Sequence, residues 1–336
     1  MTSTHSDHNA GSAMAAEIAE QPALFAKLTA PSAAGWAEAA AVAALVQDRG
    51  ADRLQVVARG TSGHAAIALK YLAESVLGLP VVIVAPSVVT QLGGSPWSRN
   101  DVVLGISQSG ASPDIVACIA SARSAGASTV AYVNTPQSPL ADAAEHSIDL
   151  RAGHEKAVAA TKSYTATLLA LMQLVAALAP RALTWPWASL APEAERLLAP
   201  SSEMNELAYR IVSARCVVTL GRGYGYATAR EAALKIMETC EVPALAYSTA
   251  EFMHGPIAAA GPGTLVLTTG AVDPEIVKRC RHRGSEVVAL PIGAGVGTLG
   301  PLTDIIPFQF LAREAAVLSG KDPDNPTALK KATLTL

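Results

Sequence analysis

The chain has 336 residues, enough for two domains of ordinary size, and half of them are hydrophobic, so a sizeable core can be buried. Only 16% are charged and the net charge is -3, which excludes the basic footprint of a nucleic-acid-binding protein and a basic membrane-binding patch. Four cysteines stand in apolar or helical settings with no CxxC pair among them, at positions 118, 216, 240 and 280. They predict buried free thiols and a cytoplasmic location.

The first half of the chain begins with a polar segment, residues 1–12, that lacks the features of a signal peptide and is expected to be a disordered tail. A first domain is predicted over 13–180. It starts with helices over about 13–28 and 33–48, after which near-continuous apolar strands alternate with helices. This alternation predicts a parallel sheet covered on both faces. The apolar helix at 165–179 is interrupted by Gln173 and is too short to span a bilayer comfortably, so we expect a core helix.

The second half repeats the plan of the first. A proline- and tryptophan-containing linker is predicted over 181–200, a second domain over 201–320 and a C-terminal active-site tail over 321–336. "RCVVTLGRG" parallels "LQVVARG", and "GTLVLTTGAVDPEIV" parallels "VVLGISQSGASPDIV". The sequence therefore predicts the α/β class. We expect two tandem domains, each a flavodoxin-like doubly wound parallel five-stranded sheet with helices on both faces.

Small polar side chains follow the predicted strand at 102–106, in the segment "SQSGAS". In open parallel sheets, ligands bind beyond the carboxyl ends of the strands, where free N–H groups and the helix dipole favour an anion. The segment thus predicts a cradle for a small phosphate monoester, formed by Ser107, Gln108, Ser109 and Ser112.

A simple helix cap is the alternative for this segment. Ser112 would be the N-cap, with Pro113 and Asp114 in the first turn, but this leaves the three preceding polar residues unexplained. A second strand end offers Thr61 and Ser62 in "ARGTSGHA". Two hydroxyl-rich turns in one half-sheet favour the phosphate site.

Three charged residues lie on one face of the helix predicted in "REAALKIMETC". Glu231, Lys235 and Glu238 stand at i, i+4 and i+7. Taken alone, the segment is typical of a solvated stripe with one ion pair. Its position directly after the glycine-rich turn of the second domain instead favours a ligand crevice.

Two further candidates lie in segments where function is common. His254 precedes Gly255 and Pro256 in a loop, where a histidine titrates near neutral pH, and Glu251 is placed to orient it. Lys331, next to Lys330, lies five residues from the end of a chain whose terminus is apolar enough to dock. No second histidine or cysteine stands at metal-ligand spacing, so no metal is expected.

The chain resembles the sugar isomerase (SIS) family. The resemblance runs from about residue 52 to the end, through "GTS", "SQSGxS", "ATK", "EAALKIME", "EFMHGP" and "LKKATLTL" in the family's order. Within the family it is similar to the isomerase half of the glutamine–fructose-6-phosphate aminotransferases. It is also similar to the SIS-type glucosamine-6-phosphate deaminases. The resemblance implies that the first two motifs hold the phosphate of a hexosamine or hexose 6-phosphate.

The resemblance also implies roles for the other residues. Glu238 would be the base that moves a proton between C1 and C2 of the open-chain sugar, with Glu231 and Lys235 lining or orienting the site. His254 would assist ring opening across a subunit interface, so a homodimer is expected. Lys331 would reach the substrate carbonyl. No cofactor is needed for such carboxylate acid–base catalysis.

Several positions depart from the aminotransferase pattern. The family's cysteine before "GTS" is Arg59 here, and the glutamate after "SQSG" is Ala111. Ala160 replaces the serine of "ASTK" at a substrate-binding position, which removes one expected hydrogen bond. The chain begins Met1-Thr2 and its first cysteine is Cys118, so no N-terminal glutaminase nucleophile is expected.

An isomerase half without an ammonia supply can run the amino-sugar reaction backwards. The interpretation is a glucosamine-6-phosphate deaminase, which converts glucosamine 6-phosphate and water to fructose 6-phosphate and ammonia. One alternative is a deglycase, deaminase or aldose–ketose isomerase that acts on another sugar phosphate. Others, from a different class, are a phosphosugar-sensing regulator and a non-catalytic binding subunit. The regulator is disfavoured because the roughly fifty residues before the first strand leave no room for a DNA-binding module.

Overall fold

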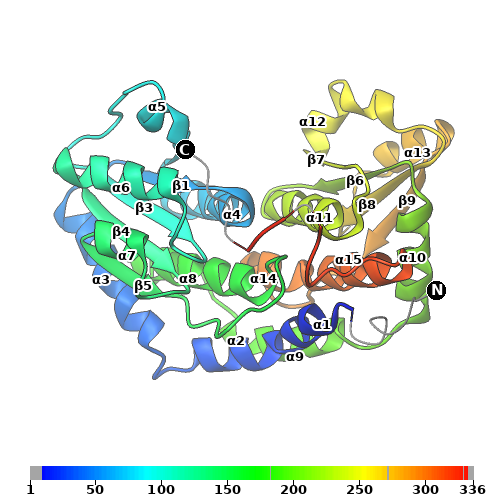
Figure 1. Ribbon diagram of the computed structural model, residues 1–336, viewed down its shortest axis with the longest axis horizontal. Helices are drawn as coiled ribbons and strands as arrows, with labels where there is room; N and C mark the ends of the chain where they lie inside the picture. The colour runs from blue at the N-terminus through cyan, green and yellow to red at the C-terminus, as the bar shows by residue number, and fades with distance from the viewer. Residues whose placement is uncertain (1–9, 182, 271, 328, 332–336) are drawn as a thin grey trace, which may run out of the picture. The chain divides into compact units, whose positions relative to one another are not determined.

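The computed structural model describes residues 10–181, 183–270, 272–327 and 329–331 (Figure 1). Most of the predicted tail at 1–12, and residues 328 and 332–336 of the predicted C-terminal tail, lie outside the described residues. The chain divides into two compact units, neither of them continuous in sequence. The five-stranded unit comprises Leu24–Gly153 and Ser163–Ala188. The four-stranded unit comprises the described residues up to Ala23, His154–Lys162 and Ser189–Lys331.

The sheet of the five-stranded unit is parallel throughout, with strand order β2-β1-β3-β4-β5. β1 (Leu54–Ala58), β3 (Val102–Ser107) and β4 (Ser128–Val133) are buried along their whole length, as expected for strands covered on both faces. β2 (Val81–Ile83) and β5 (His146–Asp149) form the edges. The order is flavodoxin-like, with its topological switch point between β1 and β3. The helices and turn of this unit are α3 (Ala34–Asp48), α4 (Gly60–Leu77), α5 (Pro86–Thr90), α6 (Pro113–Ser124), α7 (Pro139–Ala143), α8 (Lys162–Leu178) and η1 (Trp187–Ser189), apart from the first residue of α8 and the last of η1, which belong to the other unit.

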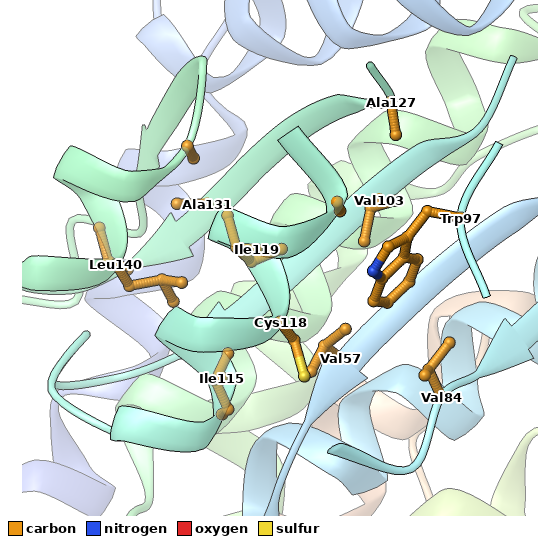
Figure 2. Packing of buried hydrophobic residues seen from close by; sticks show 13 residues of the cluster. Val57, Val84, Trp97, Val103, Ile115, Cys118, Ile119, Ala127, Ala131 and Leu140 are labelled. Carbon is orange, nitrogen blue, oxygen red and sulfur yellow. The ribbon is translucent and has the colours of Figure 1, made fainter. Parts of the chain in front are cut away.

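One hydrophobic core of this unit lies between α6 and the sheet (Figure 2). Val57 and Val103 of the sheet pack in one cluster with Cys118 and Ile119 of α6, all of them fully buried. A Cβ at Gly105 of β3 would lie 2.7 Å from Cγ1 of Ile119. Glycine at this position therefore allows α6 to lie close against the strand that leads into the polar segment "SQSGAS".

The sheet of the four-stranded unit is also parallel, with order β7-β6-β8-β9. Its strands are β6 (Cys216–Gly221), β7 (Ala244–Ser248), β8 (Thr264–Thr269) and β9 (Glu286–Leu290). α11 (Gly225–Cys240) begins after the central strand β6 and packs on β6, β7 and α15 (Ile306–Leu318). The other elements of the unit are α1 (Ser12–Ala19), α9 (Leu190–Leu197), α10 (Ser202–Ser213), α12 (Thr249–Met253), η2 (Pro256–Ala259), α13 (Pro274–His282), η3 (Gly297–Leu299) and α14 (Gly300–Asp304). α2 (Gln21–Thr29) has residues in both units.

The predicted α/β class with two parallel sheets is confirmed, with one difference in strand number. The second sheet has four strands where five were expected. After β9 the chain reads "PIGAGVGTLGPLTDIIPFQF", in which glycines and prolines leave no apolar run of strand length. This segment forms η3, α14 and α15 instead.

The predicted helix at 13–28 is two helices, α1 and α2. Pro22 occupies the second position of α2 and has no N–H to donate, so a continuous helix would lose a hydrogen bond at this point. The buried side-chain amide of Gln21 donates to the carbonyl of Ile18 at 3.1 Å and so satisfies an acceptor at the end of α1.

The expected free thiols are present in the described part of the chain. Cys118, Cys240 and Cys280 are buried, and Cys216 is partly exposed. Burial raises the pKa of the Cys118 and Cys240 thiols to about 11, which keeps them protonated and unreactive at neutral pH. Among the described helices, none has the length and apolar character needed to cross a bilayer.

One buried carboxyl gives a prediction for stability. Burial raises the pKa of Asp304 to about 6, although the N–H of Gly293 and the hydroxyl of Thr303, 2.8 and 3.4 Å from its Oδ1, favour the charged form. A pKa raised on folding contributes stability that is complete below the unfolded-state pKa and is lost as pH rises through the folded-state value. Relative to Asp304→Asn, we expect the free energy of unfolding of the wild type to fall by about 2–3 kcal/mol between pH 4 and pH 7.5. Urea denaturation of both proteins at matched pH measures this, and parallel pH profiles would contradict it.

Candidate active site

The polar segment after β3 forms a tight turn stabilised by its own hydroxyls. Oγ of the buried Ser107 accepts from the N–H of Gly110 at 3.2 Å, and Oγ of Ser109 accepts from the N–H of Ala111 at 3.3 Å. Gly110 has φ 63°. A Cβ there would lie 2.1 Å from Oγ of Ser138, so only glycine fits. The Gln108 carbonyl accepts from the N–H of Asn134 at 3.0 Å, which fixes the turn to the end of β4.

Ser112 occupies the N-cap position of α6, followed by Pro113 in the first turn, as the helix-cap interpretation predicts. Its side chain makes no capping hydrogen bond, however. No hydrogen bond of its hydroxyl to any other described residue is present, so this hydroxyl is available to a ligand. In the first turn of α6, Pro113 has no N–H, and the N–H of Ile115 donates to Oδ1 of Asp114 at 2.8 Å. A cap alone does not account for the serine.

The second hydroxyl-rich turn lies at the same edge of the sheet. α4 begins at Gly60, so Thr61 and Ser62 are in its first turn and not in a loop before it. β1 and β3 are neighbouring parallel strands, with Ala58 opposite Ile106, and α4 and α6 therefore both start at the switch point. This is the placement that an anion site needs.

An ion pair that the sequence did not reveal connects the two turns. Nε of Arg59 lies 2.8 Å from Oδ2 of Asp114, which is fully buried in the first turn of α6. Arg59 is itself the N-cap residue of α4 and is half-exposed. The pair fixes the starts of both helices to each other and adds a cation at the cradle.

α11 places three charges in the four-stranded unit as predicted, but two of them are buried. Nζ of Lys235 lies 3.3 Å from Oε1 of Glu231 and 2.5 Å from Oε2 of Glu238. Glu231 and Lys235 are at most 1% exposed, whereas the Glu238 side chain is 22% exposed. The solvated-stripe alternative is therefore wrong.

The electrostatics of this cluster follow from its burial. Desolvation on its own would lower the pKa of Lys235. The carboxylates of Glu238 and Glu231 outweigh it and raise the pKa above its ordinary value. Lys235 is therefore an ammonium held between two acidic side chains, and Glu238 is the member of the cluster that reaches solvent. A partly exposed carboxylate in a fixed position is suited to proton transfer.

His254 follows α12 directly and is exposed. Oγ of Ser248 caps this short helix by accepting from the N–H of Glu251 at 3.2 Å. The N–H of His254 donates to the Glu251 carbonyl at 3.0 Å, so the contact between these residues in the structure is through the backbone.

Lys331 contacts a buried carboxylate within the four-stranded unit. Its Nζ lies 3.0 Å from Oε2 of Glu155 and also donates to the carbonyl of Ala157. Lys330 is exposed, so Lys331 is the lysine that the structure places against this group. Glu155 was missed at the sequence level. Its signal was weak: an acidic residue in "RAGHEKAVAATK", six positions before the threonine of "ATK".

The segment around "ATK" also belongs to the four-stranded unit. Ala160 is partly buried and precedes Thr161, whose N–H donates to Oε1 of Glu155 at 2.9 Å. Lys162 is buried and pairs with Glu20 at 2.6 Å. This lysine therefore has a structural partner from the N-terminal part of the chain.

The predicted site residues fall into two sets. The cradle residues all lie in the five-stranded unit, and the others lie in the four-stranded unit: Ala160, Glu231, Lys235, Glu238, His254 and Lys331. Among the described residues, no group of three or more His, Cys, Asp or Glu side chains is arranged to hold a metal ion.

A family model described as "SIS domain" matches residues 49–177 and 210–273. The glutamine–fructose-6-phosphate aminotransferase of Methanothermobacter thermautotrophicus is 32% identical over 309 residues, covering 83% of this chain and 51% of the relative. That of Aeropyrum pernix is 33% identical over 319 residues, with 84% and 51% coverage. The chain thus spans about half the length of these relatives.

Solved structures show the same fold. A Silicibacter pomeroyi protein, provisionally assigned as a phosphosugar isomerase, matches with a TM-score of 0.81 at 34% identity over 93% of this chain and 99% of its own. Glucosamine-6-phosphate deaminase of Thermotoga maritima matches with a TM-score of 0.77 at 21% identity, over 96% and 100% of the two chains. Two matched segments that together exceed half the chain, and relatives above 30% identity, show the family. The chain belongs to the SIS-domain family.

Proposed function

We propose that this protein is an aminosugar-phosphate deaminase/isomerase that converts glucosamine 6-phosphate and water to fructose 6-phosphate and ammonia. The observation that carries the proposal is the buried Lys235 between Glu231 and Glu238. It presents one fixed, solvent-reaching carboxylate in the unit that also contains His254 and Lys331. A deaminase of the same fold, that of Thermotoga maritima, supports the reaction class.

Proton transfer is the step that this cluster supports. Glu238 takes the proton from C2 of the open-chain amino sugar and delivers it to C1. The aldehyde oxygen gains a proton and the amine nitrogen loses one, so C1 becomes CH2OH and C2 becomes the carbon of an imine. Water then adds to the imine carbon, and ammonia leaves as the C2 ketone forms, so atoms and charge balance. Lys235 orients the Glu238 carboxylate through the 2.5 Å ion pair, and Glu231 neutralises the second side of the buried ammonium. No cofactor takes part in these steps.

The remaining residues bind the substrate or assist ring opening. The turns at Thr61–Ser62 and Ser107–Ser112 hold the 6-phosphate by hydroxyls and helix N-termini. The Lys331 ammonium donates to the substrate carbonyl oxygen, and His254 assists opening of the ring from the second subunit of a homodimer. Ala160 lines the substrate position and offers a methyl group where a serine would offer a hydrogen bond.

A second candidate is an aldose–ketose isomerase, deaminase or deglycase that acts on another sugar phosphate. The same Glu238 chemistry serves it, and the specific observation in its favour is Ala160, which changes a substrate-binding position. A tagatose-6-phosphate ketose/aldose isomerase of Escherichia coli shares the fold at 18% identity. A non-catalytic sensor, in contrast, would not require the buried Glu–Lys–Glu cluster.

Replacing the proposed base tests the mechanism. Glu238→Gln should lower kcat for ammonia release from glucosamine 6-phosphate by at least about 10³-fold, because the amide cannot accept the C2 proton. Binding of the sugar phosphate, measured by calorimetry, should change by less than about threefold. Glu241→Gln is the matched control, since Glu241 is exposed just after α11 and pairs with Lys321 at 2.9 Å. Full activity in Glu238→Gln would contradict the assignment of Glu238 as the base that takes the C2 proton.

Replacing cradle hydroxyls tests phosphate binding. Ser109→Ala combined with Ser112→Ala should raise KM by about tenfold or more while kcat stays within about twofold, because the lost contacts act on a part of the substrate that does not react. Ser124→Ala, at the opposite end of α6, is the control. An unchanged KM would reduce the segment to a turn and a helix cap.

Mixing two inactive variants tests whether His254 acts across a dimer interface. In a mixed dimer of Glu238→Gln and His254→Ala subunits, one of the two sites would have both an intact Glu238 and an intact His254 from the other chain. Subunit exchange should therefore restore about a quarter of the wild-type activity at a one-to-one ratio. If each His254 serves its own subunit, mixing restores nothing and the activity stays at the sum of the two variants.

A further inference from the structure

Glu155 is a fully buried carboxylate that uses its two oxygens on two different segments of the four-stranded unit. Oε1 accepts from the N–H of Thr161 at 2.9 Å and lies 3.5 Å from its hydroxyl. Oε2 lies 3.0 Å from Nζ of Lys331, near the end of the described chain. A single side chain therefore connects the segment that contains Ala160 to the C-terminal tail.

A second buried carboxylate holds the same segment without contacting the lysine. Oε1 of Glu17 in α1 accepts from the N–H groups of Lys156 and Ala157. Desolvation raises the pKa of Glu17 above its ordinary value, and the charge of Glu155 acts in the same direction. The loop at 154–161 is thus bounded by two acidic side chains, and Lys331 is the cation that pairs with one of them.

Burial makes the pairing of Glu155 and Lys331 different from a surface ion pair. Exposed pairs contribute little because water screens both charges. Glu155 is 0% exposed, so removal of Lys331 would take an ammonium away from a carboxylate that water does not reach. Release of the tail would therefore cost the ion pair between Glu155 and Lys331.

The donors of Lys331 are divided in a way that suits its proposed role. An ammonium has three N–H donors. In the part of the chain that the structure describes, the Glu155 carboxylate and the Ala157 carbonyl are the partners of Nζ. An ammonium with these two partners can donate a third hydrogen bond to a substrate oxygen.

We propose that Glu155 is a positioning residue that docks the C-terminal tail and presents Lys331 to the substrate carbonyl. The role of Lys331 rests on the proposed function, whereas the docking does not. Through the N–H of Thr161, the same carboxylate also fixes the segment that carries Ala160. Tail docking and the order of this substrate-binding segment are thereby coupled through one side chain.

A double-mutant cycle tests the proposal. Glu155→Gln and Lys331→Ala should each lower kcat by about 10- to 100-fold, and the double variant should be no slower than Lys331→Ala, because Glu155 acts through Lys331. KM should change by less than about threefold in all three. Glu20→Gln is the control: it pairs with Lys162 in the same segment, so its effect should multiply with that of Lys331→Ala. If the kcat losses of Glu155→Gln and Lys331→Ala multiply in the double variant, the proposal is overturned.

A readout without substrate separates this proposal from the proposed function. In the full-length protein, hydrogen exchange of the amides at 321–331 should accelerate to the same extent in Glu155→Gln, in Lys331→Ala and in the double variant. If hydrogen exchange accelerates equally in the three variants but the wild type turns over no sugar phosphate, the docking proposal stands and the proposed function is rejected. Exchange in Glu155→Gln equal to that of the wild type would reject the docking. If Glu155→Gln does not fold, Glu155→Asp replaces it in both the kinetic and the hydrogen-exchange experiment. Aspartate keeps the charge but has a shorter side chain.

Discussion

The site depends on one electrostatic constraint: a lysine buried in the middle of α11 must have carboxylates beside it. Lys235 is 1% exposed and lies between Glu231 and Glu238. An ammonium in such a place is stable only when it is paired, so the helix has to carry acids one turn before and one turn after it. The same requirement fixes Glu238 in position while its side chain still reaches solvent. The pairing of Lys235 and the position of the proposed base Glu238 thus come from one arrangement.

The duplicated plan is used differently in the two units. In the five-stranded unit, the proposed phosphate cradle lies at helix starts, where α4 and α6 carry hydroxyls and an arginine–aspartate pair. In the four-stranded unit, a Cβ on Gly221 would lie 2.1 Å from the Gly225 carbonyl oxygen, so position 221, just before α11, excludes a side chain. The charged residues stand further along the helix instead. In the proposed function, one supersecondary unit therefore supplies the phosphate cradle in one copy and the base in the other.

Much of this was accessible from the sequence because it depends on local pattern. The alternation of apolar strands and helices predicts both parallel sheets, and the helical period places Glu231, Lys235 and Glu238 on one face. Contacts between residues distant in sequence were not accessible. Arg59 with Asp114 and Glu155 with Lys331 are separated by 55 and 176 residues, and no periodicity relates them. Two differences from the prediction could have been inferred from the sequence: the second sheet has four strands where five were expected, and the first helix is interrupted at Pro22. Both follow from the glycine and proline content of these segments.

The measurement that tests the central claim most directly is the release of ammonia from glucosamine 6-phosphate by the purified protein, without glutamine and without added metal. Fructose 6-phosphate should appear in equal amount, and galactosamine 6-phosphate and N-acetylglucosamine 6-phosphate should be run in parallel. The account predicts stoichiometric ammonia and fructose 6-phosphate from the first substrate. Binding of hexose phosphates with no ammonia from any of the three would contradict it.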